Sequence, residues 1–209
     1  KINAAVGLGG EGVEGPTTLI ETIQQNFGIP IHHYVEIDFY GFEQVVDTVG
    51  GIPMYFPTGV RDRGDDGVVH TSLDIPAPGC YLLDSTQALA YARTRSIEYQ
   101  RRPGDDSSWI KDRTQDFGRI TRQQDFVRRV LQRAVSKGLT DPLTMNRLID
   151  TGLKAVRVDT DLSAGDLLEL GRRFRSFDPA ELETVQLPAY ATWAGAASIV
   201  KLRQPEADA

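Results

Sequence analysis

Apolar residues at helical spacing predict a series of helices along the chain. The first covers residues 14–27, and the second begins at an N-cap, Asp38, and ends at Gly50. Asp84 and Gln87, three positions apart, form the pattern of a capping box, in which each side chain bonds the other residue's backbone. They predict the start of a third helix.

The longest apolar repeat predicts a helix from about Asp116 to Lys137. The stripe expected to face the core of that helix comprises Phe117, Ile120, Val127, Leu131 and Ala134. Two further helices are predicted at 141–153 and 166–177.

Short apolar or alternating runs between these helices predict strands. They lie at residues 31–37, 52–56, 68–75, 156–158 and 184–187. The segment 96–115 is polar and is expected to be a surface insertion. Because strands alternate with helices and no linker divides the chain, we predict an α/β fold. We expect a single domain over residues 1–209, arranged as a three-layer α-β-α sandwich with a central mixed β-sheet.

The composition fits an ordinary folded domain. Of 209 residues, 40% are apolar and 25% are charged, which argues against extended disorder. No window approaches 18 uninterrupted apolar residues, so we expect no membrane-spanning segment in this chain. A single cysteine, Cys80, excludes a disulfide within the chain and a multi-cysteine zinc site.

Charge is concentrated in the middle of the sequence. The segment from Arg93 to Arg129 holds nine Arg and one Lys against six acidic residues, a net charge of +4. The rest of the chain therefore carries −10, because the net charge of the whole is −6. A basic centre in an acidic protein favours a local anionic ligand over duplex nucleic acid, which usually binds a broad basic face.

Two arginines follow the third predicted helix, in the sequence YARTR. If the chain leaves the helix near Tyr91, an extended backbone places Arg93 and Arg95 on one side. Paired guanidinium groups form a donor fork suited to a diphosphate. The alternative is that both are solvated arginines stabilised by the C-terminal end of the helix dipole.

A second arginine block, DFGRITRQQDFVRR, opens the long helix. Arg119 and Gln123 are four positions apart and are therefore neighbours on one helix face, at the border of the apolar stripe. Arg122 is expected to lie further out, where it either reaches a ligand or is solvated. Asp116 can cap the helix or fix an arginine. We expect Arg119 and Gln123 to share a cleft with the YARTR pair, because the helix must return to the sheet near that point.

At these residues the sequence resembles the LytR-CpsA-Psr family of cell-wall glycopolymer transferases. The blocks KINAAVGLGG, IPIHHYVEIDFYGFEQVVDTVGGI, LLDSTQALAYARTR and DFGRITRQQDFV are similar to successive blocks of that family, in the same order. The resemblance covers residues 1 to about 137.

The resemblance implies a metal-dependent phosphotransferase with a defined substrate. It would attach a polyprenyl-pyrophosphate-linked glycopolymer to a cell-wall acceptor such as peptidoglycan, and it allows a pyrophosphatase activity. The residues implied as catalytic and pyrophosphate-binding are Arg93, Arg95, Arg119 and Gln123, with Arg122 also in binding and Asp116 in support. The lipid would occupy an apolar tunnel lined by Phe42, Val46, Leu89 and Phe126 or their neighbours.

The same resemblance implies the surroundings of the domain. Family members are anchored by an N-terminal membrane helix and face outward, in the envelope of Gram-positive or actinobacterial cells. Mg²⁺ or a similar divalent metal is implied as cofactor, with its ligands on segments that precede KINAA, so no metal ligand is named in this chain.

Two other functions remain open from the residues alone. The first is a non-catalytic protein that binds polyprenyl phosphates, which carboxylates for a metal would distinguish from the enzyme. The second is a nucleic-acid-binding regulator, although no helix-turn-helix pattern or aromatic platform supports it.

Overall fold

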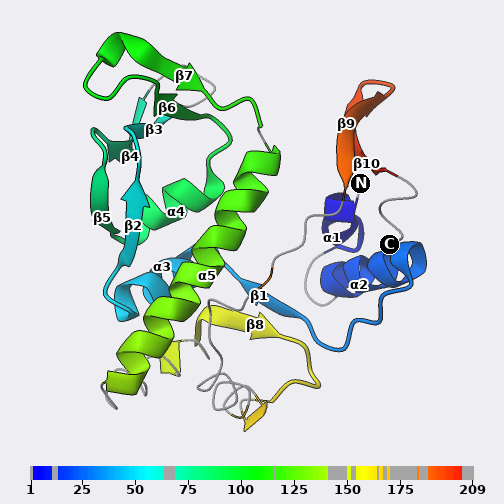
Figure 1. The fold of residues 1–209 in the computed structure, drawn as a ribbon. Coiled ribbons are helices and arrows are strands. Elements are labelled where there is room, and N and C mark those ends of the chain that lie inside the picture. Colours follow the sequence, from blue (N-terminus) through cyan, green and yellow to red (C-terminus); the bar gives the residue numbers. More distant parts are fainter. Residues whose placement is uncertain are drawn as a thin grey trace. The chain divides into compact units, whose positions relative to one another are not determined.

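The chain divides into two compact units in a computed structural model (Figure 1). One unit comprises Lys1–Tyr34 and Glu183–Ala209, and the other comprises Val35–Leu182. The residues that the structure describes are 2–10, 14–63, 69–114, 116–140, 150–151, 154–163, 165–166, 169, 183 and 188–203.

The first unit joins the N-terminal helices with a C-terminal hairpin. Its elements are η1 (Ile2–Ala4), α1 (Ala5–Leu8), α2 (Glu14–Phe27), β9 (Ala189–Ala194) and β10 (Ala197–Leu202). The helices α1 and α2 approach closely at Gly15, where an added Cβ would lie 2.7 Å from the carbonyl oxygen of Val6. The predicted helix at 14–27 is confirmed.

The second unit contains three helices and eight strands among its described residues. The helices are α3 (Phe39–Thr48), α4 (Ser85–Arg93) and α5 (Asp116–Thr140), with a short η2 (Asp106–Ser108). The strands are β1 (Val35–Ile37), β2 (Ile52–Phe56), β3 (Val60–Arg63), β4 (Val69–Ile75), β5 (Gly79–Leu83), β6 (Ile97–Gln100), β7 (Trp109–Lys111) and β8 (Val156–Val158). These elements confirm the predicted α/β fold class.

Pairing among the described strands is antiparallel throughout. One sheet has the order β4-β3-β6-β7, while β2 pairs with β5 and β1 pairs with β8. The helix α4 contacts α3, α5, β4 and β5 and so lies at the centre of this unit. No described helix is both long enough and apolar enough to cross a membrane.

The core of this unit forms where the buried faces of the strands pack against the helices. Along β2 the pattern of buried and exposed residues alternates strictly, which buries Ile52, Met54 and Phe56. They pack with Leu83, Ala88 and other buried side chains, and each large aliphatic side chain buried there is worth about 1.5–3 kcal/mol relative to exposure.

The caps of α3 and α4 form as predicted. Asp38 accepts a hydrogen bond from the Gly41 backbone nitrogen at 2.7 Å, and the capping box at Asp84 is present. After α3, Gly50 and Gly51 both adopt positive φ. A Cβ on Gly51 would also lie 2.8 Å from the carbonyl oxygen of Leu83, so glycine is required there.

Some strands differ from the sequence prediction. The strand expected at 31–37 begins only at Val35, and β3 and β5 were not predicted. The segment 96–115, expected to be a surface insertion, instead contributes β6 and β7 to the four-stranded sheet. Its polar residues Glu98 and Gln100 are buried there beside Ile97. Glu98 is paired with Arg61 at 2.7 Å, which makes a polar strand stable inside the unit.

The buried face of α5 is rotated from the predicted one. Phe126 is 3% exposed and packs with Val130 and Ala134, whereas Val127 is 52% exposed and Ile120 is also exposed. The expected stripe is therefore wrong at Ile120 and Val127. The helices expected at 141–153 and 166–177 and the strand expected at 184–187 lie largely or wholly outside the described residues.

Candidate functional site

The helix α4 presents the two arginines of YARTR at its C-terminal end. At its start, the Asp84 side chain accepts from the Gln87 backbone nitrogen at 2.8 Å, and the Gln87 side chain accepts from the Asp84 nitrogen at 3.2 Å. The helix runs to Arg93, two residues beyond the expected exit, and Thr94 leaves it with ψ of 138°. Arg93 thus lies in the last turn and Arg95 just beyond the helix.

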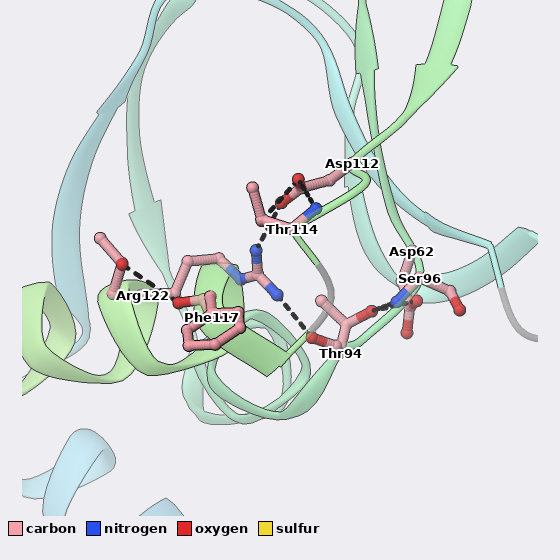
Figure 2. A network of polar contacts seen from close by, with 8 residues as sticks. Asp62, Thr94, Ser96, Asp112, Thr114, Phe117 and Arg122 are labelled. Carbon is pink, nitrogen blue, oxygen red and sulfur yellow. Dashed lines mark hydrogen bonds and ion pairs between the residues drawn. The ribbon is translucent and has the colours of Figure 1, made fainter. Parts of the chain in front are cut away.

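Two residues of α5 hold this corner through its backbone. Arg122 Nη2 donates to the carbonyl oxygen of Thr94 at 2.6 Å, and Gln123 Nε2 donates to that of Ala92 at 3.2 Å. Figure 2 shows Arg122 between Thr94 and Asp112, which accepts from Arg122 Nη1 at 3.2 Å. The end of α4 is therefore fixed to α5 by hydrogen bonds from charged and amide donors.

Thr94 also links the corner to strand β3. Its hydroxyl donates to Asp62 Oδ1 and accepts from the Ser96 backbone nitrogen, the latter at 3.1 Å (Figure 2). Because both its carbonyl and its hydroxyl are engaged, Thr94 has one defined orientation between α5 and β3.

Asp112 is the anionic partner of this network. Thr114 donates to its carboxylate from both its backbone nitrogen, at 2.8 Å, and its hydroxyl, at 2.6 Å. Partial burial by itself raises the pKa of Asp112, but the hydrogen bonds from Thr114 and the charge of Arg122 outweigh burial and hold that pKa below its ordinary value. Asp112 therefore remains ionised opposite Arg122 at neutral pH.

The four residues expected to share a cleft do so. An open pocket of about 600 Å³ in the second unit is lined by Phe39, Asp62, Arg93, Thr94, Arg95, Ser96, Arg119 and Gln123. The predicted convergence of Arg93, Arg95, Arg119 and Gln123 is thus confirmed. Their role in binding pyrophosphate stays a prediction.

Asp116, at the first turn of α5, holds two of the pocket arginines. Its Oδ1 lies 2.9 Å from Arg95 Nε and 3.1 Å from Arg119 Nη2. This matches the expectation that Asp116 fixes an arginine. Arg93 is supported differently, because its guanidinium carbon lies 4.1 Å from the centre of the Phe39 ring in a cation–π contact.

Arg122 does not lie where the sequence suggested. It is 5% exposed and is not among the residues that line the pocket. The expectation that it lies further out than Arg119 is wrong. Asp112 and the Thr94 carbonyl are internal partners that compensate this charge where it is buried.

Sequence reasoning missed four of the lining residues: Phe39, Asp62, Thr94 and Ser96. Thr94 and Ser96 alternate with the arginines of YARTR, so a fully extended exit from α4 would place them on the opposite side from Arg93 and Arg95, and no signal in the sequence indicated them. Asp62 stands between Arg61 and Arg63 on an unpredicted strand, and only the pairing of β3 with β6 brings it close to the site.

The metal implied by the family resemblance stays a prediction. No group of three His, Cys, Asp or Glu side chains able to hold a metal occurs among the described residues. Asp116 is engaged by two arginines and Asp62 by a threonine hydroxyl.

The residues expected to line a lipid tunnel are partly accounted for by core packing. Phe42 stacks on Phe126 with ring centres 4.9 Å apart, and Val46 is buried in the same core. The tunnel itself stays a prediction.

An α/β unit with an arginine-lined pocket at one helix corner is the arrangement that the sequence resemblance implied. The sequence model of the LytR_cpsA_psr family matches residues 1–209. The chain therefore belongs to the LytR-CpsA-Psr family.

Known relatives agree with this assignment. The chain is 33% identical over 144 residues to the probable cell wall biosynthesis protein LcpB of Corynebacterium glutamicum, covering 66% of this chain and 27% of the relative. It is 27% identical over 187 residues to the polyisoprenyl-teichoic acid–peptidoglycan teichoic acid transferase TagV of Bacillus subtilis, covering 90% and 41%. The chain thus spans less than half of each of these proteins.

Solved structures share the fold. A LytR-Csp2A-Psr enzyme from Actinomyces oris superposes with a TM-score of 0.75 at 26% identity, covering 97% of this chain and 70% of the other. The structure of Bacillus subtilis TagV has a TM-score of 0.64 at 23% identity, covering 97% and 67%. These matches place the chain in the family's α/β fold.

Proposed function

We propose that this chain is the catalytic part of a phosphotransferase that attaches a polyprenyl-pyrophosphate-linked glycopolymer to peptidoglycan. The observation that carries the proposal is the pocket in which Arg93, Arg95, Arg119 and Gln123 meet. Relatives named as transferases of polyisoprenyl-linked teichoic acid to peptidoglycan support the choice of donor and acceptor.

The pocket suits a diphosphate for electrostatic reasons. A pyrophosphate diester carries two negative charges and several acceptor oxygens, and guanidinium groups donate to such oxygens in pairs. Three arginines in one pocket also repel one another. Asp116 offsets that repulsion for Arg95 and Arg119, and the Phe39 ring contacts Arg93. The arginines are therefore held in place before a ligand arrives.

The proposed reaction is a displacement at the phosphorus that carries the glycan. A hydroxyl oxygen of the acceptor bonds to that phosphorus, and the bond from phosphorus to the bridging oxygen breaks. Polyprenyl phosphate leaves, and the glycan becomes joined to the acceptor through a phosphodiester. The arginines stabilise the charge that develops on the leaving phosphate, which is the main contribution that proteins make to phosphoryl transfer.

Transfer of a labelled donor tests this function. Wild-type protein, given a polyprenyl-pyrophosphate-linked disaccharide and peptidoglycan oligomers, should yield phosphodiester-linked product and free polyprenyl phosphate in equal amounts. Binding of the donor with neither product would favour a polyprenyl-phosphate-binding protein. Release of polyprenyl phosphate without transfer would indicate a pyrophosphatase.

We propose separately that a divalent metal such as Mg²⁺ supports the reaction. No step described above depends on it, because the described residues provide no ligand cluster. Chelation with EDTA should abolish transfer and added Mg²⁺ should restore it, measured with the same donor. Full transfer in the presence of EDTA would contradict the proposal that a divalent metal supports the reaction.

A further inference from the structure

Asp62 places a carboxylate among the arginines of the pocket. Of the eight residues that line the pocket, Asp62 is the only acidic one. The strand that carries it is irregular at this position, since Arg61 pairs with Asp74 on β4 but Asp62 pairs with His70. Such register shifts re-aim side chains and are common beside active sites.

The carboxylate is held in a fixed orientation. Oδ1 accepts a hydrogen bond from the Thr94 hydroxyl. That hydroxyl in turn accepts a hydrogen bond from the Ser96 backbone nitrogen, and the Thr94 carbonyl accepts one from Arg122 at 2.6 Å. Among the described residues, Oδ2 of Asp62 has no hydrogen-bond partner. Asp116, the other carboxylate near the arginines, differs in that it pairs with Arg95 and Arg119 and does not line the pocket.

A carboxylate here is unfavourable for binding an anion alone. A negative charge beside a diphosphate repels it, so a site selected only for affinity would place a neutral or basic residue at this position. The proposed transfer reaction gives the carboxylate a role, because the attacking hydroxyl must lose its proton to an acceptor as its oxygen bonds to phosphorus.

We propose that Asp62 is the catalytic residue that accepts this proton, an inference that rests on the function proposed above. As the acceptor oxygen bonds to phosphorus, its proton passes to Oδ2 of Asp62. The electron pair of the breaking bond stays on the departing polyprenyl phosphate. Thr94 keeps the carboxylate oriented through Oδ1 and takes no part in the proton transfer.

Asp62→Asn tests the proposal with little disturbance, because the amide oxygen of Asn can still accept from Thr94. The probes are geranylgeranyl pyrophosphate for binding and a polyprenyl-pyrophosphate-linked disaccharide with peptidoglycan oligomers for single-turnover transfer. We expect binding to be unchanged or tighter, and the transfer rate to fall by about 10²- to 10⁴-fold, the contribution typical of a positioned base. Asp62→Glu, which keeps the carboxylate, should recover part of the rate.

The outcomes separate this inference from the proposed function. Asp62→Asn with transfer within about threefold of wild type would overturn the inference alone, and so would a loss of lipid binding as large as that of Arg119→Ala. An Asp62→Glu variant no faster than Asp62→Asn, in spite of normal binding, would also overturn it. Failure of the wild-type protein to bind and transfer would overturn the proposed function and the inference with it.

Discussion

The charge of Arg122 lies inside the protein, where two partners bind its terminal nitrogens while the buried Nε has no hydrogen-bond partner among the described residues. Its guanidinium joins Asp112 on one side and the Thr94 carbonyl on the other, while the side chain is 5% exposed. Thr94 stands between the two arginines of YARTR. The hydrogen bond from Arg122 to Thr94 therefore positions residues that line the pocket, although Arg122 does not line the pocket.

Arg122→Ala should therefore destabilise the protein strongly. Removing one member of a buried ion pair leaves the other charge without compensation, which costs about 3–5 kcal/mol. The measurement is the free energy of unfolding in urea. Arg102→Ala, at an exposed pair with Asp105 in which Arg102 is 71% exposed, is the control and should change that energy by less than about 1 kcal/mol. Similar losses in both variants would contradict the described network.

Acid should weaken the same network. Because folding lowers the pKa of Asp112, the carboxylate contributes stability above its ordinary pKa of about 3.9 and loses that contribution as pH falls through its lower folded value. The unfolding free energy should fall below about pH 4, and less steeply in Asp112→Asn. Asp150→Asn, at an exposed pair with Lys154, serves as the control and should keep the wild-type slope.

Substitution of Arg119 should weaken ligand binding without changing the stability of the fold. Its side chain faces the pocket and pairs with Asp116, so Arg119→Ala should leave the melting temperature nearly unchanged. It should weaken binding of a polyprenyl pyrophosphate by about 1.5–3 kcal/mol, the range for hydrogen bonds to charged groups. That is roughly 10- to 150-fold in affinity. Arg129→Ala, on the same helix but outside the pocket, should leave binding intact. If the Arg119→Ala protein were unfolded, Arg119 would have a structural role.

At the scale of elements, the start of α4 is stabilised by its capping box. The capping box at Asp84 satisfies backbone donors that have no partner within the helix. Asp84→Ala should cost about 0.5–2 kcal/mol of stability, measured by thermal unfolding. Asp84→Asn keeps a cap and should remain close to wild type. An Asp84→Ala variant as stable as Asp84→Asn would show that the cap contributes little.

Local patterns were sufficient to predict the caps and several complete elements. Asp38, Asp84 and the strand 52–56 could be read from neighbouring residues alone, because caps and strand alternation are set within a few positions. The long helix was predicted at the right place, yet its buried face was not. The buried face begins with Arg122, and a charged residue looks like part of a solvated face in the sequence.

Buried polar strands could not be predicted in this way. β6 carries Glu98 and Gln100 inside the sheet, and their burial depends on partners that are distant in the sequence, such as Arg61. The candidate site shows the same division. The arginine blocks and Gln123 were recognisable from spacing and family resemblance, whereas Asp62 reaches the pocket only through the pairing of β3 with β6.

At the scale of the whole molecule, we propose that the protein acts outside the cytoplasm, because its proposed acceptor, peptidoglycan, lies there. Cys80 is the single cysteine of the chain and is exposed. A membrane-impermeant maleimide should therefore label Cys80 in intact cells, and Cys80→Ser should remove the label from this position. Labelling that requires lysis of the cells would contradict the proposed location.

The central claim is that the pocket binds a lipid through its pyrophosphate. Calorimetric titration of the wild-type chain with geranylgeranyl pyrophosphate and with geranylgeraniol, its alcohol, tests this most directly, because the two ligands share the lipid chain and differ only in the diphosphate group. Three arginines in one pocket predict saturable binding of the pyrophosphate at least about tenfold tighter than that of the alcohol, since one hydrogen bond to a charged group is worth about 1.5–3 kcal/mol. Equal affinity for the two ligands, or binding of neither, would contradict the account.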